Sequence, residues 1–150
     1  MSLIAQIDAD LKKAMLAREA DKLSVLRMLK SAVKYSSIEK GGADFVPTDL
    51  DVLAVVRKEV KKREDSITSY SEAGRTDLAD KEKQELEFLR TFLPAQMAPE
   101  KVEALVKEVI QETGATSKAQ MGAVMKAAQA KAAGQVDGKT LSQIVQRLLP

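Results

Sequence analysis

The chain has 150 residues, carries 24 Lys and Arg against 22 Asp and Glu for a net charge of +2, and contains no cysteine or histidine. These two absences exclude disulfide frameworks, thiol nucleophiles, imidazole bases and the preferred ligands of zinc. Abundant Ala, Leu, Lys, Glu and Gln with only 3% aromatic residues predict an all-α fold, and no apolar run approaches the about 20 residues of a membrane span.

Four helices are predicted over the first 94 residues, because apolar side chains recur there at helical spacing. Their expected ranges are 2–18, 20–38, 48–74 and 75–93. Ser2 is a candidate N-cap of the first helix, and Thr48 or Asp49 caps the third. Gly41-Gly42 ends the second helix, and Pro94 stops the fourth.

The segment Pro94–Pro99 is uncharged and has a proline at each end, so it is the predicted boundary between a domain of residues 1–94 and one of residues 95–150. Glycines at 114 and 134 end two further helices, and Asp137 can cap a last one. The apolar faces expected on these helices are Val102, Leu105, Val106, Val109 and Ile110; Met121, Val124, Met125, Ala128 and Ala132; and Leu141, Ile144, Val145, Leu148 and Leu149. The second domain is therefore expected to be a small three-helix bundle behind a four-helix domain.

Positive charge is concentrated near the C-terminal end of the chain. Residues 1–94 carry 17 basic and 17 acidic side chains, whereas residues 114–150 carry five basic side chains against Asp137 alone. The last segment is therefore the candidate for contact with an anionic partner.

A stripe on the penultimate helix is the strongest candidate surface. Lys118, Gly122, Lys126 and Gln129 follow one another at +4, +4 and +3, about 100° around the helix from the methionine face. A glycine inside a helix costs about 1 kcal/mol relative to alanine, which invites a reason for its presence. Either it lets a phosphate backbone or a partner helix approach, or it lets a neighbouring helix of the same bundle pack closely while the lysines are only solvated.

The loop Ala133–Lys139 offers two interpretations of its own. Its backbone amides and Lys139 could hold a phosphate or carboxylate at the start of the last helix. Alternatively, Gly134 ends one helix and Asp137 caps the next without any ligand.

Two features of the first domain have both a functional and a structural interpretation. A secondary basic face could meet RNA or could be solvated and ion-paired, since acidic residues are interleaved with it. On the fourth helix, Glu82 and Glu85 could act as an acid pair or could accept ion pairs from Arg57, Lys61 or Arg63. The residues of the secondary basic face are Arg27, Lys30, Lys34, Arg57 and Lys61.

The ordered series of short motifs resembles the GatB/YqeY family, and most of all its free-standing YqeY-like members. The matching positions span nearly the whole chain: residues 26–32, Arg57-Lys58, Lys61–Arg63, Ala73–Arg75, Asp77-Leu78, Glu82, Glu85, Leu93-Pro94, Gln96-Met97, Gly114-Ala115, Met121-Gly122, Val124-Met125, Gly134 and Asp137–Lys139.

The resemblance implies an N-terminal helical domain followed by a module similar to the tail domain of the B subunit of the tRNA-dependent amidotransferase. That enzyme converts Glu-tRNA(Gln) or Asp-tRNA(Asn) to the amide form with glutamine as nitrogen donor, and its tail is thought to hold tRNA. The catalytic cradle of the B subunit has no counterpart here, so a carbon–nitrogen ligase label would be inherited rather than carried by this chain.

We therefore expect a cytoplasmic, non-catalytic accessory protein that binds tRNA, without a cofactor or metal. An amidotransferase or another translation-related protein is the expected protein partner. The alternative is a helical protein–protein adaptor that binds no RNA. The expected RNA contacts are Lys118, Gly122, Lys126, Gln129, Lys139 and Arg147.

Overall fold

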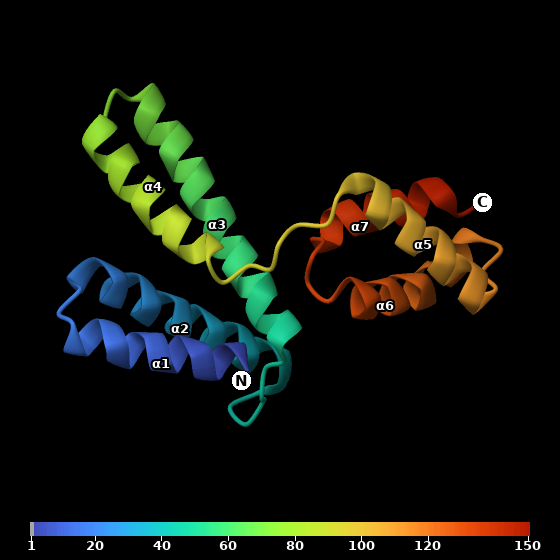
Figure 1. Cartoon of the computed structure of the whole chain (residues 1–150), viewed down its shortest axis with the longest axis horizontal. Coiled ribbons are helices and arrows are strands. Elements are labelled where there is room, and N and C mark those ends of the chain that lie inside the picture. The colour runs from blue at the N-terminus through green and yellow to red at the C-terminus, as the bar shows by residue number, and fades with distance from the viewer. Residues whose placement is uncertain (1) are drawn as a thin grey trace. The chain divides into compact units, whose positions relative to one another are not determined.

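The computed structural model describes residues 2–150 and shows seven α-helices and one 3-10 turn, with no strand among those residues (Figure 1). The all-α prediction is confirmed. The chain divides into unit 1, Met1–Leu93, and unit 2, Pro94–Pro150. That the two units are separately folding domains stays a prediction.

The helices follow one another without long insertions. Unit 1 contains α1 (Leu3–Leu16), α2 (Ala20–Gly41), α3 (Asp49–Glu72) and α4 (Thr76–Arg90). Unit 2 contains α5 (Pro99–Thr113), the 3-10 helix η1 (Lys118–Gln120), α6 (Met121–Ala132) and α7 (Gly138–Leu148).

Side-chain caps define the starts of two helices in unit 1. The Ser2 hydroxyl accepts the N–H of Ala5, 3.2 Å away, at the start of α1. At α3, Thr48 Oγ1 accepts the Asp51 N–H while Asp51 Oδ2 accepts the Thr48 N–H, which completes a capping box. Hydrogen bonds from Lys40 and from the Thr48 N–H lower the pKa of the Asp51 carboxyl, which keeps the carboxylate ionised.

Two predicted helix ends differ from the structure by three residues, whereas α1 and α3 end two residues earlier than expected, at Leu16 and Glu72. α2 continues to Gly41 instead of Ile38, because Gly42, with φ of 85°, adopts the conformation that ends it. α4 ends at Arg90 instead of Leu93, because the N–H groups of residues 91–93 bond to carbonyls three residues back. Pro94 has no N–H with which to continue the helix.

Unit 1 is built from two antiparallel helical hairpins, α1–α2 and α3–α4, that cross at an angle in Figure 1. All four helices contribute to one core. Its fully buried members include Ile7, Leu29, Val56 and Leu89, one from each helix in chain order.

Unit 2 has a separate core formed by α5, α6 and α7. Val106, Val124, Leu141 and Val145 have no exposed side-chain surface, and none of them belongs to the core of unit 1. Every residue predicted on the three apolar faces is buried or half-buried, so these faces are confirmed. The linker residue Met97 also packs on this core, and its N–H donates to the Gln135 carbonyl at 3.0 Å.

Candidate functional site

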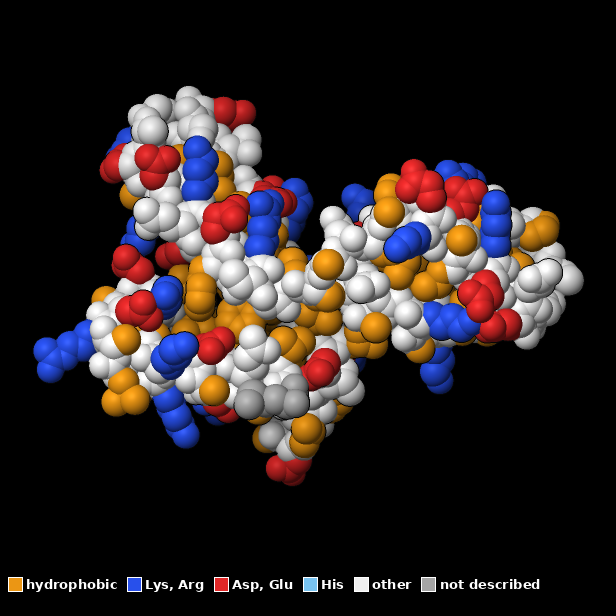
Figure 2. Space-filling view, in the orientation of Figure 1, with side chains coloured by type: hydrophobic (Ala, Val, Ile, Leu, Met, Phe, Trp, Pro, Cys, Tyr) orange, Lys and Arg blue, Asp and Glu red, His pale blue; other side chains and the backbone are white. Residues whose placement is uncertain are grey.

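The basic residues of unit 2 fall into a paired and an unpaired group. Lys131 contacts Glu108 at 3.0 Å and Glu112 at 2.7 Å, and Arg147 contacts Glu103 at 3.0 Å. All three glutamates lie on α5, which therefore neutralises one side of the α6–α7 pair. Hydrogen bonds to Glu112 and Glu108 raise the pKa of Lys131. Basic and acidic side chains lie side by side on the face of unit 2 drawn in Figure 2.

Three lysines of the same segment remain without a carboxylate partner within ion-pair distance in the described part of the chain, residues 2–150. They are Lys118 on η1, Lys126 on α6 and Lys139 on α7, and all three are exposed. Arg147, predicted to be a fourth contact of this kind, is held by Glu103. Because surface ion pairs are weak, that contact reduces its availability without removing it.

The predicted stripe is correct for only three of its four residues. Gly122, Lys126 and Gln129 are all exposed on α6 at spacings of four and three residues. Lys118 instead lies on the 3-10 turn that precedes this helix. A 3-10 turn advances by about 120° per residue against about 100° for an α-helix, so Lys118 does not continue the stripe.

Gly122 does not serve packing within unit 2. It is the second residue of α6 rather than a mid-helix residue, and a Cβ atom added to it would have no heavy atom within 4 Å. The interpretation that a neighbouring helix of the bundle packs closely against this glycine is therefore wrong. The open surface beside Lys126 remains accessible to a partner.

Gly122→Ala is expected to stabilise unit 2, by less than the about 0.5–1 kcal/mol that this exchange gives in a helix interior, because alanine has the higher helix propensity and the added methyl group contacts no neighbouring segment. Urea denaturation monitored by circular dichroism measures the change. If the variant were less stable than the wild type, Gly122 would have a packing role within the folded chain. Lower tRNA affinity in the more stable variant would indicate close approach of the RNA to this position.

The loop between α6 and α7 has the capping arrangement expected from the sequence. Asp137 Oδ2 accepts the Thr140 N–H at 3.2 Å and begins α7. The end of α6 differs in detail, because Ala133, with φ of 48°, is its left-handed capping residue and Gly134 follows with φ of 81°. Phosphate binding by Lys139 and this loop stays a prediction.

The secondary basic face of unit 1 is partly neutralised. Lys30 contacts Asp8 at 2.7 Å and Lys61 contacts Asp65 at 2.9 Å. Arg57 is also engaged in an interaction. Arg27 and Lys34 are exposed and have no ion pair with residues 2–150. This face is therefore the weaker candidate for an anionic partner.

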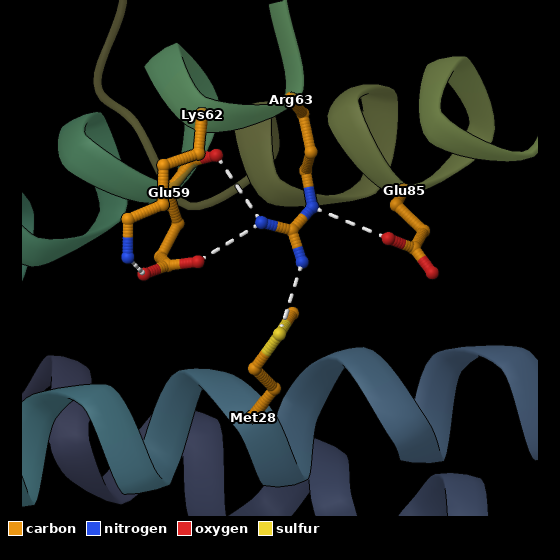
Figure 3. Close-up of polar contacts among 5 residues, drawn as sticks. All are labelled: Met28, Glu59, Lys62, Arg63 and Glu85. Carbon is orange, nitrogen blue, oxygen red and sulfur yellow. Dashed lines mark hydrogen bonds and ion pairs between the residues drawn. The ribbon is translucent and has the colours of Figure 1, made fainter. Parts of the chain in front are cut away.

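A buried ion-pair network lies inside unit 1 at the crossing of α3 with α2 and α4 (Figure 3). The Arg63 guanidinium contacts Glu59 Oε2 at 2.9 Å through Nη1 and Glu85 Oε2 at 3.3 Å through Nε. Its Nη2 lies 3.4 Å from the Met28 sulfur, and Lys62 contacts the other Glu59 oxygen at 3.0 Å. Residues Glu59 and Arg63 are each only 5% exposed.

Sequence reasoning missed the burial of this network and considered Arg63 as one of three possible ion-pair partners of Glu82 and Glu85. The available signal was spacing, since Glu59 and Arg63 continue the helical stripe of Val52 and Val56. The expected ion pair between α3 and Glu85 is present, with Arg63 as its partner. No group of three acidic side chains in residues 2–150 is placed to share a metal ion.

A small cavity of about 270 Å³ lies between α2 and α4, where Figure 2 shows a hollow lined by hydrophobic atoms. Val25 and Phe88 form its apolar surface, and Glu85 extends to its edge. Because Glu85 is already paired with Arg63, the cavity presents no free carboxylate from that network.

Comparison with known proteins identifies relatives along almost the entire chain. The sequence model of a family described as Yqey-like protein matches residues 4–149. An uncharacterized protein of Schizosaccharomyces pombe is 39% identical over 93 residues, which cover 62% of this chain and 73% of that protein.

Two further relatives carry the name altered inheritance of mitochondria protein 41, mitochondrial. The one from Vanderwaltozyma polyspora is 30% identical over 111 residues, or 73% of this chain and 59% of that protein. The one from Clavispora lusitaniae is 33% identical over 92 residues, or 61% of this chain and 52% of that protein. The chain thus spans little more than half the length of these two relatives.

The relatives bear on the expected location of the protein. The proteins of Vanderwaltozyma polyspora and Clavispora lusitaniae are mitochondrial by name. No helix in residues 2–150 is long and apolar enough to span a bilayer. The cytoplasmic location expected from the sequence stays a prediction.

Proposed function

The chain belongs to the Yqey-like protein family, and from this premise we propose that it is a non-catalytic accessory protein that binds tRNA through unit 2. The sequence resemblance of this unit to the tail domain of the amidotransferase B subunit supports the proposal. The protein partner would then be an amidotransferase or another protein of translation.

The observation that carries the proposal is the distribution of unpaired lysines. Lys118, Lys126 and Lys139 come from three successive helical segments, and no carboxylate in residues 2–150 neutralises them. The acidic residues of α5 pair with Lys131 and Arg147 instead. In unit 2 the glutamates of α5 therefore form ion pairs with Lys131 and Arg147. The three lysines named first have no such pair within residues 2–150 and are free to bind an anion.

Recognition of this kind would depend on the RNA backbone and shape. Unit 2 contains no aromatic residue for base stacking. Lysine binds phosphate as a point charge, so the affinity should depend strongly on salt. Exposed Gly122 would let a phosphate group come close to the surface of α6 next to Lys126.

A salt titration with unfractionated tRNA, read by fluorescence anisotropy, tests the proposal. Three phosphate contacts predict a log–log slope of about −2 to −3, and Lys118→Glu with Lys126→Glu should make this slope shallower by about 2. The same double variant should lower the affinity at least about tenfold at low salt.

Lys12→Glu with Lys13→Glu provides the matched control, because it makes the same charge change at exposed positions of α1 in unit 1. This control should retain most of the affinity. If the wild type and the Lys118/Lys126 variant bound tRNA equally poorly at low salt, this result would contradict the proposal. In that case the protein–protein adaptor would be the remaining function.

A further inference from the structure

A groove in unit 1 is not used by the proposed RNA contacts. α2 and α3 lie antiparallel, since an ion pair joins Lys40 to Asp51 at one end and Arg63 contacts Met28 at the other. Between these ends a groove of about 840 Å³ extends along residues 28–39 of α2 and 54–62 of α3. The twelve residues 28–39 of α2 span about 16 Å along the helix axis, or three turns.

The groove exposes apolar surface beside the core of unit 1, to which Val55 belongs with only 8% of its surface exposed. Ala32 and Val55 line it, and beside them Met28 is 40% exposed and Tyr35 68% exposed. Tyrosine is enriched at the energetic centres of protein interfaces, and methionine adapts its shape to different partners. An apolar strip with these residues at its edges is typical of an interaction surface.

The charges along the groove have a definite arrangement. Lys58 and Lys62 lie one turn apart on α3, and Lys58 has no ion pair with residues 2–150. Glu59, between them, is buried and pairs with both Arg63 and Lys62, so Lys58 is the lysine of the groove that keeps its charge uncompensated. The one acidic lining residue without an ion pair in the described chain is Glu39, at the other end of the groove on α2.

The two walls also limit the conformation of an occupant. Both are α-helices whose backbone groups are already bonded within each helix, so they offer no edge to which an extended peptide could add. A helical occupant satisfies its own backbone and can bury an apolar face. Among the lining residues of the described chain, Tyr35 is the one side chain that could stack on a base, whereas a helix could use Met28, Ala32 and Tyr35 together.

We propose that the α2–α3 groove binds an amphipathic helix of a partner protein, about three turns long. Its apolar face packs against Met28, Ala32, Tyr35 and Val55. A carboxylate of the partner helix contacts Lys58, and a cation contacts Glu39. The groove gives unit 1 a protein partner that is independent of the lysines of unit 2.

Selection from a displayed library of helical peptides against the full chain tests this proposal. The library randomises the outward face and the flanks of a 14-residue helix. Enriched sequences should combine an apolar stripe at i, i+3, i+4 and i+7 with acidic residues on one flank. Enriched sequences without acidic flanks would overturn the proposal.

Variants of the protein then locate the binding of the selected peptides. Tyr35→Ser and Lys58→Glu change exposed side chains of the groove, and each should weaken binding about tenfold. Lys12→Glu on α1 makes the same charge change elsewhere and should have no effect. Equal binding to the wild type and to both groove variants would overturn the proposal.

A charge exchange gives the sharpest result. A selected peptide in which the acidic flank is replaced by lysine should bind Lys58→Glu better than it binds the wild type. Unfractionated tRNA is the competing ligand. If tRNA displaced the peptides and Lys58→Glu weakened tRNA binding as much as peptide binding, the groove would be an RNA site and the proposal would be wrong.

Discussion

Replacing Arg63 with methionine is expected to lower the free energy of unfolding of unit 1 by about 3 kcal/mol. Arg63 is the shared partner of Glu59 and Glu85, whose side chains are only 7% and 19% exposed. Removing one member of a buried ion pair leaves its partner desolvated and uncompensated, which costs about 3–5 kcal/mol. The lower end of this range applies to Arg63→Met, because Lys62 still contacts Glu59 at 3.0 Å and partly compensates its charge.

A double replacement separates the lost charge from the lost packing. Glu59→Leu combined with Arg63→Met removes the nearest buried acid together with its partner. Replacing a buried pair with apolar residues of similar volume is often neutral or stabilising, so the double variant should recover most of the loss. Urea denaturation of the wild type, both single variants and the double variant completes the cycle. An Arg63→Met variant as stable as the wild type would show that the network contributes little.

This network marks one limit of what the sequence could predict about the fold. The helix faces of unit 2 were predictable because each consists of apolar residues at a regular spacing, as in Val102, Val106 and Val109. Arg63 breaks the apolar pattern of α3, and its burial depends on Glu85, which is 22 residues later in the chain. Periodicity within one helix contains no information about a partner on another helix.

The candidate site shows the same limit. The sequence identified Lys126 and Lys139 by their charge, and the structure places both in solvent without a carboxylate partner in residues 2–150. It could not separate them from Arg147, because the partner of Arg147 is Glu103 on another helix. The 3-10 turn that carries Lys118 was also missed, since an α-helical count assumes that a single geometry continues through the segment.

Leu141→Ala is expected to destabilise unit 2 by about 2–5 kcal/mol and to leave unit 1 folded. Leu141 has no exposed surface, and its core shares no residue with the core of unit 1. Unit 2 has only 57 residues, and a core of that size rarely supplies more than about 3–5 kcal/mol. The substitution should therefore unfold much of unit 2 at 25 °C.

Amide hydrogen exchange followed by NMR measures the stability of each unit in the intact chain. Leu141→Ala should abolish protection in α5–α7 and leave the amides of α1–α4 protected. Leu29→Ala, equally buried in unit 1, is the reciprocal control. Loss of protection in both units after either substitution would mean that the chain unfolds as one domain. Separate responses of the two units would instead leave α1–α4 protected in Leu141→Ala. If this variant then also fails to bind tRNA, the affinity for RNA depends on folded unit 2.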